Sequence, residues 1–134
     1  MGRCTLLLAV ALVALAACRG DENGEVGEVE QTVRDFVEAT NQRDEEAFCE
    51  DLVTQEFLEQ STGATGDEAT ESCRKQFGRL KGLKVELVRI RSTKVDGDSA
   101  QVRAELKTQG QAQDQLLRLK NEDGDWRLTG NQGR

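Results

Sequence analysis

The sequence predicts an α+β fold in which helices come first and antiparallel strands follow. Between residues 26 and 80, apolar residues recur every three or four positions, which is the period of an amphipathic helix. From residue 84 the period changes to two, as in a half-buried strand. Glycine-containing turns separate the strand-like runs, and a length of 134 residues allows a single domain. Helices followed by an antiparallel meander define the α+β class.

The helices are predicted from the faces that their apolar residues share. The first predicted helix starts at Val26, and its apolar face consists of Val26, Val29, Val33, Phe36, Val37 and Thr40. Residues 41–44 break this helix and start a second one, and Thr54 caps a further short turn. Thr65 and Glu68 have the spacing of a capping box. They open a predicted helix whose inward residues are Ala69, Cys73, Phe77 and Leu80.

Four strands are predicted from alternating apolar and polar residues. The first covers residues 84–95, where a slip of phase between Leu87 and Val88 indicates a β-bulge. The second covers residues 100–109, and the others contain Leu117 with Leu119 and Trp126 with Leu128. Hairpin turns are predicted at residues 96–98 and 123–125. The predicted inward strand positions are Val88, Ile90, Ala100, Val102, Ala104, Leu106, Thr108, Leu117, Leu119, Trp126 and Leu128.

Residues 1–17 have the composition of a secretory signal peptide. Arg3 supplies a positive charge, and the 12 residues from Leu6 to Ala17 are all Leu, Val or Ala. A helix needs about 20 apolar residues to cross a bilayer, so this run is too short to span one. A buried core helix is the alternative, but the run has no polar residue to form a solvent-facing side. The segment therefore predicts export from the cytoplasm.

Leu15-Ala16-Ala17-Cys18, directly after the apolar run, resembles the lipobox of bacterial lipoproteins. The resemblance implies a diacylglyceryl thioether on Cys18, release by the lipoprotein signal peptidase, and often an added N-acyl chain such as palmitate. Two or three acyl chains hold a protein durably on a bilayer. We therefore expect a lipid-anchored protein on the extracytoplasmic side of the cell membrane. Ordinary cleavage that leaves Cys18 unmodified is the alternative.

The lipobox divides the chain into four expected parts. These are the lipoprotein signal peptide at 1–17, the lipidated cysteine and polar tether at 18–25, the α+β domain at 26–130 and a polar tail at 131–134. Cys4 leaves with the signal peptide, so Cys49 and Cys73 remain for pairing in an oxidising compartment. A metal site is the alternative, but the chain has no histidine and two thiolates do not complete a tetrahedral zinc site. The sequence therefore predicts a Cys49–Cys73 disulfide, no metal and no cofactor.

The helix–gap–helix opening and two hairpins resemble the NTF2-like superfamily, and within it small actinobacterial-type lipoproteins of unassigned function. The matching segments are residues 33–39, 41–49, 95–102 and 124–128. The resemblance covers residues 26–130. It implies N-terminal helices packed on a curved antiparallel sheet of about four strands, which together form a cone with a pocket at its open end.

Catalysis is not predicted. Enzymes of this superfamily, such as ketosteroid isomerases and polyketide cyclases, resemble one another in a pocket Asp or His base with a Tyr or Asp donor. This sequence has no histidine and no tyrosine, and none of its predicted inward strand positions is ionisable. It contains no nucleophile–base pair, glycine-rich phosphate loop or metal-ligand spacing. An isomerase- or cyclase-type enzyme, or an enzyme-derived pocket for a small apolar substrate, is kept as the alternative.

Charge is distributed unevenly along the chain. Residues 21–71 hold 17 acidic and 2 basic residues, whereas residues 72–134 hold 8 acidic and 14 basic ones, within a total net charge of −7. If the apolar strand positions face the helices, the basic residues of the strands share the opposite, outward face of the sheet. Glu105 is the only clear acidic residue on that face. This candidate contact face consists of Arg89, Arg91, Arg103, Lys107, Arg118, Lys120 and Arg127.

The basic face has two interpretations. It is a solvated surface whose charges deter aggregation, or it contacts anionic lipid headgroups or an acidic protein partner. Because such a face repels its own copy, we expect a monomer. Nucleic acid is not an expected partner, since the face lacks aromatic residues for base stacking. The sequence predicts a membrane-anchored, non-enzymatic module that binds a partner or a small apolar ligand of unknown identity.

Overall fold

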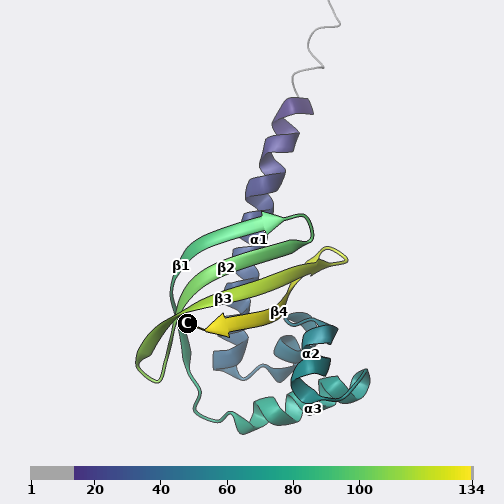
Figure 1. The fold of residues 1–134 in the computed structure, drawn as a ribbon, viewed down its shortest axis with the longest axis vertical. Helices are drawn as coiled ribbons and strands as arrows, with labels where there is room; N and C mark the ends of the chain where they lie inside the picture. The colour runs from purple at the N-terminus through teal and green to yellow at the C-terminus, as the bar shows by residue number, and fades with distance from the viewer. Residues whose placement is uncertain (1–13, 134) are drawn as a thin grey trace, which may run out of the picture.

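The computed structural model describes residues 14–133, with side chains described for residues 24–130. The expected signal peptide therefore lies largely outside the described residues, as does Arg134. Helices pack on one face of a four-stranded antiparallel sheet, which confirms the predicted α+β class (Figure 1). The sheet is visibly bent and is not closed, because β1 and β4 are its two edges.

Helix α1 (Ala14–Gln42) packs on the sheet through an apolar stripe (Figure 1). Val29, Val33 and Val37 are buried, as the helical period predicts. Arg43, with a φ of 60°, ends the helix in the left-handed region. The helix starts twelve residues earlier than the predicted Val26, so the expected tether is helical. In Figure 1 the N-terminal part of α1 extends beyond the β1–β2 hairpin, away from α2 and α3.

Three short helical segments follow α1: η1 (Ala47–Asp51, a π-helix), α2 (Gln55–Thr62) and α3 (Asp67–Arg79). Thr54 caps α2 as predicted, since its hydroxyl accepts a hydrogen bond from the Phe57 N–H. The predicted capping box at Thr65 is wrong, because Gly66 is the N-cap of α3 and makes no side-chain cap bond. The Glu59 carboxylate instead accepts a hydrogen bond from the Gly66 N–H at 3.0 Å.

The strands are β1 (Val85–Asp96), β2 (Ser99–Thr108), β3 (Gln111–Glu122) and β4 (Asp125–Gly133), paired in sequence order. Both predicted hairpin turns are present. Gly97 has a φ of 59°, and the Asp123-Gly124 pair has φ values of 54° and 93°. Two successive positive φ values define the turn type that matches the twist of a hairpin. Strand β4 continues through residues that were expected to form a polar tail.

Strand β1 contains two irregularities where one was predicted. Register shifts occur between Leu87 and Arg89 and between Ile90 and Ser92, so Val88 and Arg91 are extra residues without a cross-strand partner. Each extra residue reverses the alternation of inward and outward side chains. Leu87 and Ile90, on either side of Val88, therefore both lie on the inward face. The prediction that Val88 faces inward is therefore wrong, and its side chain is 43% exposed.

The remaining predicted inward positions lie on the helix-covered face. Ile90, Leu106 and Thr108 are half-buried there, and the fully buried ones are Ala100, Val102, Ala104, Leu117, Leu119, Trp126 and Leu128. The free edge of β4 is covered by residues 52–54, where Val53 forms a parallel bridge with Leu128. Within residues 14–133, no helix has both the length and the apolar composition needed to cross a membrane.

Candidate functional site

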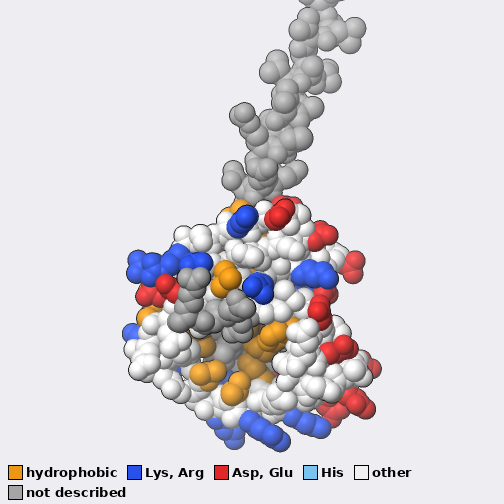
Figure 2. All heavy atoms as spheres, in the orientation of Figure 1, with side chains coloured by type: hydrophobic (Ala, Val, Ile, Leu, Met, Phe, Trp, Pro, Cys, Tyr) orange, Lys and Arg blue, Asp and Glu red, His pale blue; other side chains and the backbone are white. Residues whose placement is uncertain are grey.

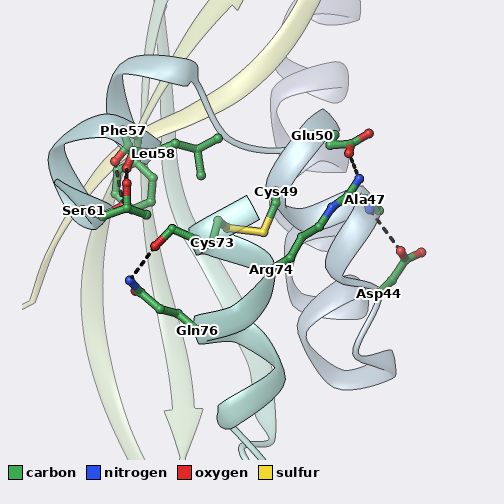
Figure 3. The surroundings of a disulfide bond; sticks show 12 residues. Asp44, Ala47, Cys49, Glu50, Phe57, Leu58, Ser61, Cys73, Arg74 and Gln76 are labelled. Atoms are coloured by element: carbon green, nitrogen blue, oxygen red, sulfur yellow. Dashed lines mark hydrogen bonds and ion pairs between the residues drawn. A yellow bond between two sulfur atoms is a disulfide. The ribbon is translucent and has the colours of Figure 1, made fainter. Parts of the chain in front are cut away.

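The predicted disulfide joins η1 to α3. Cys49 and Cys73 are 1% and 7% exposed, and their Cα atoms lie 6.0 Å apart. Both cysteines occupy the apolar sides of their helical segments, so helix packing brings them together. Closing a loop with a sequence separation of 24 residues stabilises the fold by about 3.5 kcal/mol in the chain-entropy model. In Figure 3 the bond has Phe57, Leu58 and Ser61 on one side and Arg74 and Glu50 on the other.

An apolar cavity of about 180 Å³ lies beside this disulfide, between η1, α2 and α3. Phenylalanines dominate its wall: the Phe48 and Phe77 rings stack with centroids 4.6 Å apart, and Phe36 packs behind Phe48 at 5.2 Å. All four phenylalanines of the chain therefore lie at or next to this cavity. The residues that line it are Phe48, Phe57, Leu58, Ser61, Thr62, Cys73, Gln76, Phe77 and Leu80, and none of these is ionisable.

The polar residues of the lining are largely engaged within their own helices. The Ser61 hydroxyl donates to the Phe57 carbonyl at 2.7 Å, and the Thr62 hydroxyl donates to the Leu58 carbonyl at 2.6 Å. The Gln76 amide donates to the Ser72 hydroxyl oxygen at 3.3 Å. Because both hydroxyl hydrogens are already used, the cavity presents to a ligand mainly apolar surface, hydroxyl acceptors, and the oxygen and second N–H of the Gln76 amide.

Leu80 forms the exposed rim of the cavity. Its side chain is 50% exposed although it also lines the cavity, so it lies at the opening. Figure 2 shows apolar side chains at the surface of a hollow between the sheet and the helical end of the domain. The Arg43 guanidinium donates to the Leu80 carbonyl at 2.7 Å and thereby ties the end of α1 to the end of α3. The rim is therefore bordered by a fixed cation.

A larger open cleft of about 730 Å³ lies on the other side of the disulfide and is organised around Glu50. Arg74 forms an ion pair with the Glu50 carboxylate, and Arg127 donates to the Glu50 backbone carbonyl (Figure 3 shows the ion pair). Among the described residues, the Nε atoms of both arginines are buried and have no hydrogen-bond partner. Charged residues of both signs line this cleft, namely Glu50, Asp67, Glu71, Arg74, Glu122 and Arg127. Glu50, Arg74 and Arg127 contact one another, whereas Glu71 forms its ion pair with Lys75, outside the lining.

The predicted basic face is more mixed in sign than the sequence suggested. Arg89 and Arg91 both reach the Glu105 carboxylate, at 2.7 and 2.9 Å, and Arg91 also binds Asp114 at 2.8 Å. Asp114 is thus a second acid on a face where only Glu105 was expected to oppose the cations. The hydrogen bond and charge of Glu105 raise the pKa of Arg89. Two of the seven candidate cations are therefore already paired.

The other five candidates are spread over three strands. Arg103 lies opposite Ser92, Lys107 lies opposite Glu86, and Lys120 lies opposite Arg127 in the strand register. Arg118 is exposed on β3. Arg127 is drawn to η1 by its hydrogen bond with the Glu50 carbonyl, so it contributes to the charged cleft. The register does not join the seven residues into one uniformly basic surface.

The side chain of Cys18, the predicted lipidation site, is not described, and its backbone lies within α1. Sequence reasoning missed the apolar cavity, because residues 57–62 were assigned only to a short turn and a loop. The available signal was that each of the four helical segments α1, η1, α2 and α3 carries one of the four phenylalanines. Among the side chains that the structure describes, no group of three or more His, Cys, Asp or Glu residues is arranged to hold a metal ion.

No family model and no curated protein matches the sequence. A solved structure described as a de novo designed protein with curved β-sheet is similar over 48% of this chain and 62% of the designed chain. The identity is 20% and the TM-score is 0.40.

Proposed function

We propose that this protein is a membrane-anchored extracytoplasmic lipoprotein whose NTF2-like domain binds a small apolar ligand in the phenylalanine-lined cavity. The proposal depends chiefly on the described lining of that cavity, which is apolar and aromatic and includes no ionisable side chain. Small-molecule sites are typically apolar hollows with few polar groups. The helices-then-sheet order and the bent, open sheet support the NTF2-like assignment.

The size of the cavity limits the ligand. An enclosed apolar cavity of roughly 150 Å³ is large enough to bind benzene. At about 180 Å³, this cavity is suited to one aromatic ring or a short alkyl segment. The stacked Phe48 and Phe77 rings provide flat surfaces for either group.

The proposed role is binding without catalysis. General acid–base chemistry in such a pocket requires a carboxylate or imidazole whose pKa is tuned by apolar surroundings. The hydroxyl groups of Ser61 and Thr62 donate to carbonyls of their own helix, and neither has a base beside it in the described lining. These contacts favour the binding role over the isomerase- or cyclase-type alternative.

The membrane anchor is proposed from the lipobox at Leu15-Ala16-Ala17-Cys18. Metabolic labelling with an alkyne analogue of palmitate tests it in the producing bacterium. We expect the native chain to be labelled and to sediment with membranes, and we expect Cys18→Ser to lose both properties. Cys4→Ser, which changes the cysteine of the signal segment, is the matched control and should keep the label. Equal labelling of Cys18→Ser and the native chain would contradict the anchor.

Ligand binding is tested on the full chain in phosphatidylcholine nanodiscs by equilibrium dialysis of radiolabelled 1-octanol, with empty nanodiscs subtracted. Gln76 is exposed and lines the cavity, so Gln76→Trp should cover the opening without changing the buried core. We expect saturable binding to the native chain and a loss of at least about tenfold in Gln76→Trp. Gln60→Trp, exposed on α2 but outside the cavity wall, should bind like the native chain. The binding proposal is wrong if the native chain takes up no more octanol than empty nanodiscs do.

A further inference from the structure

Cationic residues lie next to Leu80, the rim residue of the apolar cavity. Arg79 and Lys81 are the sequence neighbours of Leu80, and both are exposed. The Arg43 guanidinium lies 2.7 Å from the Leu80 carbonyl. Within the described part of the chain, the side chains of Arg79 and Lys81 form no hydrogen bond or ion pair, in contrast to those of Arg89 and Arg91 on the sheet.

The surrounding sequence strengthens this local charge. The segment from residue 72 to residue 84 contains five basic residues and no acidic one, although the net charge of the chain is −7. Figure 2 shows Lys and Arg side chains gathered at the lower end of the molecule, where Figure 1 places the end of α3 and the connection to β1. Acidic side chains gather along the right side of that view. The segment that carries the rim residue Leu80 is therefore locally basic within an acidic protein.

Helix-end electrostatics explain part of this arrangement. Arg79 is in the last turn of α3, where the helix dipole favours a cation, and Arg43 binds a terminal carbonyl. Lys81 lies beyond the helix end and makes no such contact. The helix dipole also does not explain why Leu80, which is half-exposed and lines the cavity, has a cation without a side-chain partner on each side in the sequence.

We infer that the cavity takes a small amphiphile with a carboxylate head group, such as a medium-chain or aromatic carboxylate. This inference rests on the proposed function and adds the chemistry of the ligand to it. The apolar part would lie among Phe48, Phe57 and Phe77, and the carboxylate would lie at the rim beside Arg79 and Lys81. Charge-assisted hydrogen bonds of this kind are shorter and stronger than neutral ones.

The test compares octanoate with 1-octanol, which share an eight-carbon chain but differ in head-group charge. Both are dialysed at neutral pH against the full chain in phosphatidylcholine nanodiscs, with empty nanodiscs subtracted. We expect octanoate to bind at least about tenfold more tightly than octanol, which corresponds to about 1.4 kcal/mol. The preference should weaken in high salt, because rim charges are exposed to screening.

The double variant Arg79→Glu with Lys81→Glu reverses the rim charges at exposed positions. Octanoate binding should fall at least about tenfold, and octanol binding should not change. Lys94→Glu with Lys120→Glu reverses two exposed lysines on the sheet and matches the change in net charge. Octanoate binding to this control should equal that of the native chain.

Each other outcome is decisive. If octanoate and octanol bind equally, or if the two double variants weaken octanoate equally, the carboxylate inference is wrong and the apolar cavity remains. If neither probe binds above empty nanodiscs, both the inference and the proposed function are wrong. If octanol binds and octanoate does not, the ligand is uncharged and the rim cations serve only the helix ends.

Discussion

Glu59 holds together the connection between α2 and α3. Its carboxylate accepts hydrogen bonds from the Gly66 N–H at 3.0 Å and from the Gln55 side-chain amide at 3.2 Å. Gln55 in turn donates to the Gly66 carbonyl at 3.0 Å, so the three residues form a closed ring of contacts. The Gly66 hydrogen bond, and after it that of Gln55, lowers the pKa of Glu59 from its ordinary value of 4.5.

This lowered pKa makes the stability of the connection depend on pH. Because the folded pKa lies below the unfolded one, the stabilising effect is present above pH 4.5 and is lost as pH falls through the folded pKa. We expect Glu59→Gln to melt at a lower temperature than the native chain at neutral pH, and the difference to shrink in acid. Thermal unfolding followed by circular dichroism measures this. Glu56→Gln, on the same helix, controls for the loss of one negative charge. A difference in melting temperature between Glu59→Gln and the native chain that does not change with pH would contradict the prediction.

Asn41 joins the end of α1 to the start of β1. Its side-chain amide donates to the Val85 carbonyl at 2.6 Å, and its side-chain oxygen accepts from the Val85 N–H at 2.8 Å. Both hydrogen bonds are partly buried, beside an open hollow that Asn41 and Val85 line. This one side chain therefore completes the hydrogen bonding of an edge strand where the sheet begins.

Replacing Asn41 should lower the stability of the fold more than replacing a surface residue of the same helix. Asn41→Ala removes two partly buried hydrogen bonds, and at about 0.5–1.5 kcal/mol each we expect it to lower the free energy of unfolding by about 1–3 kcal/mol. Gln42→Ala is the matched control, because the Gln42 amide donates only to Glu38 on the surface of the same helix. It should cost about 0.5 kcal/mol or less. Chemical denaturation measures both, and equal losses would show that the Asn41 contacts contribute no more than a surface pair.

At the scale of elements, periodicity predicted those segments that have one buried face. The four strands were found near their observed positions because alternation identifies a half-buried strand. The start of α1 was missed because its N-terminal part extends beyond the sheet, where no neighbour imposes an apolar face. In β1 the alternation indicated one phase slip, whereas the register contains two. A second extra residue, Arg91, is polar on an exposed face and leaves no mark on the apolar pattern.

The register of β1 predicts stability changes of different size for two adjacent residues. Leu87 is half-buried and lies opposite Leu106, so Leu87→Ala should destabilise the domain by about 1–2 kcal/mol, below the loss at a fully buried leucine. Val88 is 43% exposed and unpaired, so Val88→Ala should change the stability by less than about 0.5 kcal/mol. Denaturant unfolding of both variants measures the difference. A larger loss of stability for Val88→Ala than for Leu87→Ala would mean that Val88 faces inward, as the sequence predicted.

At the scale of the whole molecule, the order of patterns predicted the fold class but not the cavity. The Cys49–Cys73 pair followed from counting cysteines, which requires no knowledge of packing. The cavity depends on how η1, α2 and α3 meet, and their lining residues are separated by up to 32 positions. The basic face was predicted from alternation alone, which cannot show that Arg91 reaches across to Asp114 on β3. The residue pattern contains no information on contacts between segments that are distant in the sequence, so these contacts could not be predicted.

The fold also separates the proposed anchor from the cavity. At 1.5 Å per residue, the α1 backbone from Cys18 to Val29, the first buried residue of the helix, spans roughly 16 Å. Figure 1 places this part of α1 next to the β1–β2 hairpin, whereas α2, α3 and the start of β1 lie at the opposite end. If Cys18 carries lipid, the cavity opens away from the membrane that holds the anchor, and its ligand reaches it from the aqueous side.

Two exposed turn glycines report on this orientation, Gly97 between β1 and β2 and Gly82 between α3 and β1. With the lipidated chain in nanodiscs that carry a gadolinium-chelating lipid, we expect strong line broadening of the Gly97 amide resonance and weak broadening of the Gly82 resonance. The Cys18→Ser chain, mixed with the same nanodiscs, should show neither effect, which separates anchoring from random contact. Stronger broadening at Gly82 would mean that the cavity end faces the membrane, and the ligand would then enter from the lipid surface.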